Sequence, residues 1–175
     1  KEIDRQRDRK IELENIIAEK RIYQGVKIRP EEIVKVLNNV TENFDARLAQ
    51  LLDDMAETLH QANGVGLAAP QVGVLRRVVV IDVGEGVIEL VNPEIITESG
   101  TQYEVEGCLS CPGQWGITKR PMHVTVRAQD RNGKSFTISG KALLAKAFCH
   151  EIDHLDGILF LTKVVRKLSP EELEQ

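Results

Sequence analysis

Two histidines and a glutamate near the C-terminal end of the chain have the spacing of a catalytic metal site. His150 and His154 are four residues apart, so in an α-helix both imidazoles project from one side, one turn apart. Glu151 follows the first histidine, where it can reach a metal-bound water without entering the coordination shell. The spacing therefore supplies two metal ligands and a general base.

The same three residue types also occur on solvated or core helices, and the residues around them favour the metal interpretation. Most flanking positions are apolar: Ala142, Leu143, Leu144, Ala147, Phe148, Ile152 and Leu155. A charged side chain in such a helix needs a partner that offsets the loss of its hydration. A divalent metal would be such a partner.

A catalytic site of this kind usually takes a third protein ligand and leaves one position open. In one class of metalloprotease the third ligand is a histidine beyond the second one; here Gly157 fits that pattern, but Phe160 stands where the histidine should be. A glutamate from a second long helix is not favoured either, because residues 155–175 have the pattern of a strand and a short polar end. The third ligand is therefore expected upstream of this helix.

The composition is that of an ordinary globular domain. The chain has 175 residues, 42% of them hydrophobic and 29% charged, which suits one domain with a real core. Its net charge of −4 and the lack of a long basic run do not indicate a nucleic-acid surface. The sequence has neither an apolar run of membrane-helix length nor the apolar centre of a secretory signal. These features predict a cytoplasmic protein without membrane contact.

The three cysteines, Cys108, Cys111 and Cys149, are too few and too clustered for the disulfide framework of a secreted domain. Cys108 and Cys111 form a Cys-x-x-Cys pattern, which alone would suggest a redox pair or half of a zinc site. Pro112 and Gly113 follow at once, and there is no second cysteine pair to complete a four-thiolate site. Thiolate ligation or a structural thiol is the favoured interpretation.

An uncharged, glycine-rich stretch covers residues 64–73. A phosphate-binding loop would need a following Lys and Ser or Thr, or a further Gly opening a helix, and neither is present. The stretch therefore predicts a backbone that approaches another group closely, with Gln71 as its only polar side chain. On the residues alone, such a glutamine more often satisfies the backbone than takes part in catalysis.

Hydrophobic periodicity predicts an α+β fold, in which a mostly antiparallel sheet packs around the histidine-bearing helix. Residues 45–62 have the spacing of an amphipathic N-terminal helix, and Ser169 with Pro170 begins a short C-terminal helix. The segment 29–32 has the pattern of a further helix start. Strands are expected at 77–83, 87–91, 95–104, 123–128, 134–139 and 158–164. The second should end at Asn92-Pro93, the third should be interrupted at Ser99-Gly100, and a hairpin turn is expected at Asn132-Gly133.

Three motifs together resemble the peptide deformylase family, metalloenzymes that remove the N-formyl group from newly made bacterial and organellar polypeptides. They are Gly64-Val65-Gly66-Leu67-Ala68-Ala69-Pro70-Gln71, Glu106-Gly107-Cys108-Leu109-Ser110 and His150-Glu151-Ile152-Asp153-His154, in that order. The resemblance runs from about Phe44 to Val165. It defines a single metallohydrolase domain over 44–175. Residues 1–43 form a divergent N-terminal segment, since they lack the Asp-Pro-x-Leu-Arg segment usual in the family.

The resemblance implies a metal site of Cys108, His150 and His154, with water in the fourth position. This agrees with the ligand expected upstream of the helix. The family points to Fe²⁺ as the native ion, with Zn²⁺, Ni²⁺ or Co²⁺ as substitutes, whereas the donor set alone suits Zn²⁺.

The resemblance also implies the catalytic groups. Glu151 would take a proton from the attacking water and deliver it to the leaving amine. The Gln71 amide and the backbone N–H of Leu109 would stabilise the charge on the formyl oxygen. Glu106 would pair with an arginine that the sequence does not identify.

The implied substrates are N-formylmethionyl peptides of nascent chains. Gly64 and Gly66 would let the substrate backbone lie close, as an added strand. The methionine side chain would enter an apolar pocket, and the resemblance suggests that Val65, Leu109, Ala147 and His150 line it.

The other expected properties are transient ribosome contact, a monomeric state and no sequence-specific binding of nucleic acid. Two alternatives stay open on the residues alone. A zinc-dependent metalloendopeptidase would use the same helix but would have no role for Cys108. A non-catalytic module that binds a metal or a peptide would not need Glu151.

Overall fold

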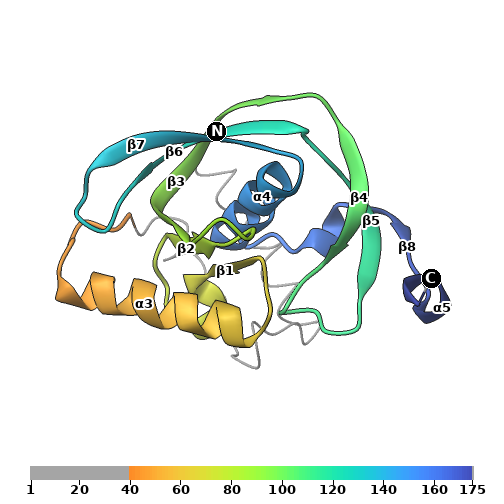
Figure 1. Cartoon of the computed structure of the whole chain (residues 1–175), viewed down its shortest axis with the longest axis horizontal. Helices are drawn as coiled ribbons and strands as arrows, with labels where there is room; N and C mark the ends of the chain where they lie inside the picture. Colours follow the sequence, from red (N-terminus) through yellow and green to blue (C-terminus); the bar gives the residue numbers. More distant parts are fainter. Residues whose placement is uncertain (1–39, 175) are drawn as a thin grey trace, which may run out of the picture.

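One central helix lies between two antiparallel sheets in the computed structural model, which describes residues 40–174 (Figure 1). The larger sheet has the strand order β1-β2-β3-β6-β7 and the smaller has β4-β5-β8. The strands are β1 Gly66–Ala68, β2 Val78–Ile81, β3 Ile88–Ser99, β4 Gln102–Gly107, β5 Trp115–Arg120, β6 His123–Gln129, β7 Ser135–Lys141 and β8 Val164–Lys167. The helices are α3 Ala46–Gln61, α4 Leu143–Leu155 and α5 Pro170–Leu173, with short 3₁₀ turns at Ala69–Val72 and Phe160–Thr162. The predicted α+β class is confirmed, but the strands divide into two sheets.

Helix α3 covers one face of the larger sheet. Asp45 caps its N-terminus, because the carboxylate accepts a hydrogen bond from the Leu48 backbone N–H at 3.0 Å. Its apolar stripe is buried against the sheet residues Leu67, Val78 and Val80. The stripe consists of Leu48, Leu52, Met55 and Leu59. The helix predicted over 45–62 is therefore confirmed.

Helix α4 is the central helix and carries the histidine motif. Phe148 is fully buried in a cluster with residues of β2, β3 and β6. A side chain at Gly140 would overlap this packing, because its Cβ would lie 2.7 Å from both Phe148 and Leu144. At the other end of the helix, Arg77 donates a hydrogen bond to the carbonyl of Leu155 at 3.1 Å. The chain therefore fixes α4 at both ends.

The prediction that a strand would end at Asn92-Pro93 was wrong. Strand β3 continues through these two residues and pairs with β6 across a register shift between Val91 and Glu94. Asn92 has a φ of 51°, and its side chain binds Thr41 and Gln129. A bulge of this kind tolerates a proline, because its missing N–H is not needed in the ladder. Strand β3 thus joins the predicted strand 87–91 to the first part of the predicted strand 95–104, and the expected interruption at Ser99-Gly100 is confirmed as the end of β3.

The smaller sheet differs from the sequence prediction in two places. Strand β5 was not predicted, although it is the middle strand of that sheet. The strand expected at 158–164 is instead a buried turn, with Leu159 and Phe160 in the interior, and pairing begins only at Val164. The sharp break at Gly100, where φ is 69°, sends the chain from β3 into the second sheet.

The β6–β7 hairpin and the short helix after Ser169 are confirmed. The helix start expected at 29–32 lies outside the described residues. Within residues 40–174, no helix is long and apolar enough to cross a membrane.

We predict that Phe148→Ala lowers the free energy of unfolding by about 3 to 5 kcal/mol, because it leaves a cavity beneath α4. Chemical denaturation of metal-free protein measures this change without a contribution from ligand binding. Leu143→Ala is the matched control on the same helix. Since Leu143 is 44% exposed, its truncation should change stability by no more than about 0.5 kcal/mol. Similar losses in both variants would contradict the central packing role of Phe148.

Candidate metal centre

Three potential metal-binding side chains meet beside the C-terminal half of α4. The Sγ atom of Cys108 lies 3.3 Å from Nε2 of His154, and the Nε2 atoms of His154 and His150 are 3.2 Å apart. All three potential ligand atoms lie within 4.8 Å of one another. His154 is buried and Cys108 half-buried. The structure thus brings together the three residues that the resemblance named.

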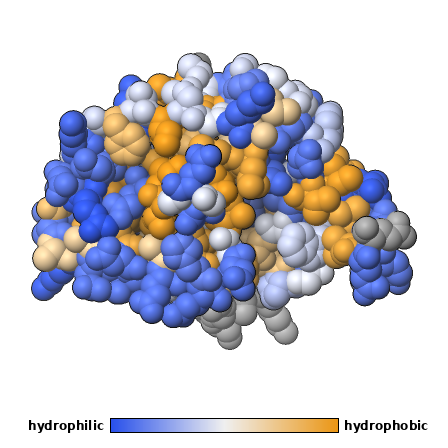
Figure 2. All heavy atoms as spheres, viewed as in Figure 1, coloured by the Kyte–Doolittle hydropathy of each residue, from blue (hydrophilic) through white to orange (hydrophobic). Residues whose placement is uncertain are grey.

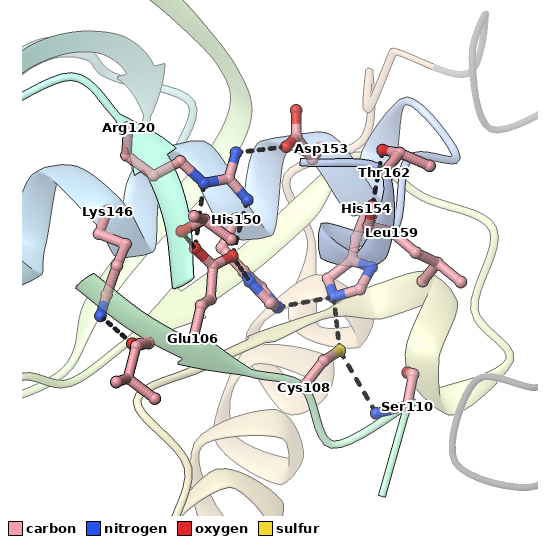
Figure 3. A network of polar contacts seen from close by, with 12 residues as sticks. Glu106, Cys108, Ser110, Arg120, Lys146, His150, Asp153, His154, Leu159 and Thr162 are labelled. Carbon is pink, nitrogen blue, oxygen red and sulfur yellow. Dashed lines mark hydrogen bonds and ion pairs between the residues drawn. The ribbon is translucent and has the colours of Figure 1, made fainter. Parts of the chain in front are cut away.

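Strand β4 positions the cysteine. Cys108 directly follows the end of β4 and begins a turn, in which the N–H of Cys111 donates to the carbonyl of Cys108 at 3.0 Å. The backbone N–H of Ser110 points at the Cys108 sulfur from 3.4 Å (Figure 3). Without metal, the neighbouring Cys111 thiol and burial raise the pKa of Cys108, and the Ser110 N–H counters them only in part.

A buried carboxylate orients the first histidine. Oε1 of Glu106 lies 2.5 Å from Nδ1 of His150, and Arg120 donates two hydrogen bonds to Glu106 at 2.7 and 3.1 Å (Figure 3). Thr118 donates to the same carboxylate at 2.5 Å, and Arg120 also donates to Asp153 at 2.7 Å. In the contact between His150 and Glu106, Nδ1–H of the imidazole donates to the carboxylate. Nε2 is then left without a proton and faces the other two ligand atoms.

Arg120 is the arginine partner of Glu106 that sequence reasoning could not identify. It lies on β5, directly before Pro121, and β5 was the strand that the hydrophobic pattern missed. The register of β4 with β5 pairs Glu106 with Gly116, so Arg120 reaches the carboxylate along the strand. The sequence alone does not give this register, so it offers several arginines as equal candidates for the partner of Glu106.

The charges of this network act in opposite directions on the two histidines. Burial raises the pKa of Glu106, but hydrogen bonds from His150 and Arg120 outweigh it and hold that pKa well below its usual range. Burial lowers the pKa of His150, yet the Glu106 contact raises it above the ordinary value. For His154, burial and the nearby His150 both lower the pKa far below 6.5. His154 therefore stays neutral, which is the form of a histidine that binds a metal.

These side chains fit a divalent metal. One sulfur and two imidazole nitrogens form a donor set that suits Zn²⁺ or Fe²⁺ and leaves room for a further ligand. Two neutral Nε2 atoms that face each other at 3.2 Å would repel through their lone pairs, unless a proton or a metal lies between them. The hydrogen-bonded carboxylate behind His150 is the usual companion of a metal-binding histidine.

Glu151 lies beside this cluster and is buried. Its Oε2 has no hydrogen-bond partner within residues 40–174. Burial raises its pKa from 4.5 to about 7, partly countered by His150. A buried carboxyl group that titrates near neutral pH has the properties of a general base or acid.

Gly66 leaves room for this carboxylate. A Cβ at Gly66 would lie 2.6 Å from Cγ of Glu151, closer than nonbonded atoms can approach. A Cβ at Gly64 would likewise lie 2.9 Å from Leu59 and 3.0 Å from Leu109. The glycines were predicted to admit a substrate backbone. The structure gives them a second role, which is to let the loop pack against Glu151 and Leu109.

The predicted oxyanion residues lie next to the cysteine. Gln71 is buried; its Oε1 accepts from the Ala68 N–H at 2.8 Å, and its Nε2 donates to Ser110 at 3.0 Å. The same Nε2 lies 3.9 Å from the Cys108 sulfur. The N–H of Leu109 makes no hydrogen bond to the part of the chain that the structure describes. Ser110, which orients Gln71, was not singled out by sequence reasoning.

A cavity of about 430 Å³ opens onto this cluster. Apart from His154, which is buried beneath it, every predicted site residue lines the cavity: Gly64, Val65, Gly66, Gln71, Cys108, Leu109, Ala147, His150 and Glu151. Sequence reasoning missed an apolar rim of Val105, Trp115 and Leu143, each more than 40% exposed. Figure 2 shows apolar side chains gathered over β4 and β5 on this side of the molecule. Exposed aromatic and aliphatic side chains around the mouth of a cavity indicate a binding surface.

Comparisons with known proteins agree with the geometry. The family model for polypeptide deformylase matches residues 24–169, so the similarity begins before Phe44. The peptide deformylase of Caldicellulosiruptor bescii is 61% identical over 145 residues, which are 83% of this chain and 87% of that one. The peptide deformylase of Acetivibrio thermocellus is 57% identical, with 83% and 85% covered.

Solved structures show the same relationship. The crystal structure of a peptide deformylase from Legionella pneumophila has 44% identity and a TM-score of 0.69, with 79% of this chain and 83% of that chain covered. The enzyme from Thermotoga maritima has 36% identity and a TM-score of 0.70, with 74% and 91% covered. This chain therefore belongs to the polypeptide deformylase family, the metal-dependent hydrolases that remove N-formyl groups from nascent peptides.

Proposed function

We propose that Cys108, His150 and His154 hold the catalytic metal of this deformylase. The observation that carries the proposal is the convergence of three ligand atoms within 4.8 Å at the base of the cavity, beside the buried Glu151. A divalent metal bound there would supply Lewis-acid chemistry, by polarising the formyl carbonyl and making water a better nucleophile. We propose Fe²⁺ as the native ion, with Zn²⁺, Ni²⁺ and Co²⁺ as substitutes.

Glu151 is the proposed proton carrier. It takes a proton from the attacking water as the water adds to the formyl carbon, and it delivers that proton to the amine nitrogen as the C–N bond breaks. Two features support this role. The carboxylate has a free oxygen within the described structure, and its pKa of about 7 lets it both accept and release a proton at neutral pH.

Gln71 and Leu109 are the proposed donors to the formyl oxygen, on which negative charge develops. Gln71 is held in place by the Ala68 N–H and by Ser110, so its amide requires no reorientation during the reaction. Leu109 contributes a backbone N–H at the turn that begins with Cys108. Preorganised donors of this type typically contribute about 2.7 to 4 kcal/mol each to the transition state.

The cavity also suits the rest of the substrate. Strand β1 is an edge strand of the larger sheet, so its free side can pair with an extended peptide. Val65, Leu109, Ala147 and the ring of His150 line the cavity, where they would contact the methionine side chain. A tight space beside the proposed metal would exclude acyl groups larger than formyl.

The wider setting follows from the substrate. Nascent peptides emerge from the ribosome, so we propose a cytoplasmic location, transient ribosome contact and action as a monomer. Residues 1–43 are proposed to be a divergent segment ahead of the metallohydrolase domain, although the family match already includes residues 24–43. The metalloendopeptidase alternative is not favoured, because it gives no role to Cys108.

We predict that Glu151→Gln lowers kcat for a formylmethionyl peptide by about 10² to 10⁴, because the amide cannot carry the proton. Bound metal should remain close to the wild-type content, since Glu151 is not a proposed ligand. Formate release and metal analysis on the same preparation measure both quantities. Wild-type kcat in this variant would contradict the proton-carrier role.

We predict that Cys108→Ala loses most of the bound metal, because one of three protein ligands is removed. Cys149→Ala is the matched control, since Cys149 is a second cysteine next to the motif but is not a proposed ligand. Metal content after gel filtration distinguishes the two variants. Retention of metal by Cys108→Ala would instead support an endopeptidase-type site.

Without metal, Glu151 should destabilise the fold at alkaline pH. Its folded pKa of about 7 is raised above 4.5, so the stability associated with its neutral form is present below pH 4.5 and is lost as the pH rises through 7. The stability advantage of metal-free Glu151→Gln over the metal-free wild type should therefore grow by about 2 to 3 kcal/mol between pH 5 and pH 8. Urea denaturation at both pH values measures this difference. A pH-independent difference would contradict the burial argument.

A further inference from the structure

The proposed mechanism leaves the second cysteine of the Cys-x-x-Cys motif without a role. Cys111 is 4% exposed and lines the cavity together with Cys108. It is not among the three side chains whose ligand atoms converge. The thiol of Cys111 nevertheless lies within hydrogen-bonding range of the thiol of Cys108.

The backbone brings the two cysteines to disulfide distance. The hydrogen bond from the Cys111 N–H to the Cys108 carbonyl closes a four-residue turn at 3.0 Å. Such a turn holds the Cα atoms of its first and last residues within about 7 Å. Disulfides in proteins span Cα separations of about 4.4 to 6.8 Å. A bond between these sulfurs therefore needs only side-chain rotation and small local adjustment.

We propose that Cys108 and Cys111 are a peroxide-sensitive pair, which forms a reversible disulfide and thereby withdraws Cys108 from the metal. The second half of this statement rests on the proposed role of Cys108 as a metal ligand. The cavity gives a small hydroperoxide access to the half-buried Cys108. Cys149 is a poor competitor because it is buried and does not line the cavity.

The reaction balances with a hydroperoxide as the oxidant. The Cys108 sulfur attacks one peroxide oxygen, the O–O bond breaks, and the sulfur becomes a sulfenic acid as the peroxide is reduced to water. The Cys111 sulfur then attacks the Cys108 sulfur, the S–O bond breaks, and hydroxide leaves and takes up the thiol proton as water. Two thiols and one hydrogen peroxide thus give one disulfide and two waters.

A nearby second thiol changes the fate of an oxidised ligand. A sulfenic acid without a partner can oxidise further to sulfinic and sulfonic acids, which reductants do not reverse. A sulfenic acid at Cys108 has the Cys111 thiol in contact, so the disulfide should form first. Oxidation would then stop activity but preserve the cysteine for reduction and metal reloading.

The test treats the metal-loaded enzyme with hydrogen peroxide and follows peptide masses, released metal and formate production. Trypsin leaves Cys108 and Cys111 together on the peptide 78–119 and Cys149 on the separate peptide 147–163. We expect the wild-type peptide 78–119 to lose about 2 Da, with metal release, and to regain both mass and activity after reduction and metal addition. Cys149→Ala should behave in the same way.

In Cys111→Ala, the same peptide should instead gain about 32 or 48 Da, and its activity should not return on reduction. Cys111→Ser separates the loss of the thiol from any packing effect and should behave as Cys111→Ala does. The proposal is overturned if wild-type Cys108 is converted directly to sulfinic or sulfonic acid. It is also overturned if Cys111→Ala recovers activity as fully as the wild type.

Two outcomes separate this proposal from the proposed function. If the disulfide forms but the metal stays bound, the metal-ligand role of Cys108 fails and the withdrawal mechanism fails with it. If untreated enzyme releases no formate, the proposed function fails, while the masses and the released metal still decide whether the disulfide forms.

Discussion

The carboxylate of Glu106 is the point at which the smaller sheet is joined to the metal-binding helix. It extends from β4, accepts hydrogen bonds from Thr118 and Arg120 on β5, and contacts His150 on α4. Arg120 extends the connection to Asp153, one turn further along the helix. Since Cys108 lies two residues after Glu106 on the same backbone, this network also sets the separation between the cysteine and the histidines. Two further hydrogen bonds join β4 to the start of α4: Gln102 donates to the Ala142 carbonyl, and Lys146 donates to the Val105 carbonyl.

Such a network is costly to bury, because ionised groups lose their hydration in the interior. The structure offsets that cost by pairing every ionised group: Glu106 with Arg120, and Arg120 with Asp153. Glu151 is the exception. It is buried without a cationic side chain bonded to it within residues 40–174, and its pKa rises to about 7 as a result. The same desolvation that destabilises the metal-free fold thus gives the carboxyl group the pKa that proton transfer requires.

Much of the fold and of the site could be predicted from the sequence where local periodicity determines structure. The apolar spacing of α3 and α4 and the hairpin at Asn132-Gly133 identified those elements, and the helical period alone placed His150 and His154 on one face. Cys108 needed the family motifs, since nothing local connects it to α4. Strand β5 was missed because Gly116 interrupts its pattern, and that glycine is required where Val164 of β8 packs against it. Arg120 was missed for the same reason, since its role depends on a strand register rather than on a motif.

The most direct test of the account is metal-dependent formate release. The protein is purified without oxygen, freed of metal, and reloaded with increasing amounts of Fe²⁺, and formate release from a formylmethionyl peptide is measured at each step with the bound metal. The account predicts a rate that rises in proportion to bound iron and saturates at one ion per chain. A metal-loaded protein that releases no formate, or a metal-free protein that releases it at the full rate, would contradict it.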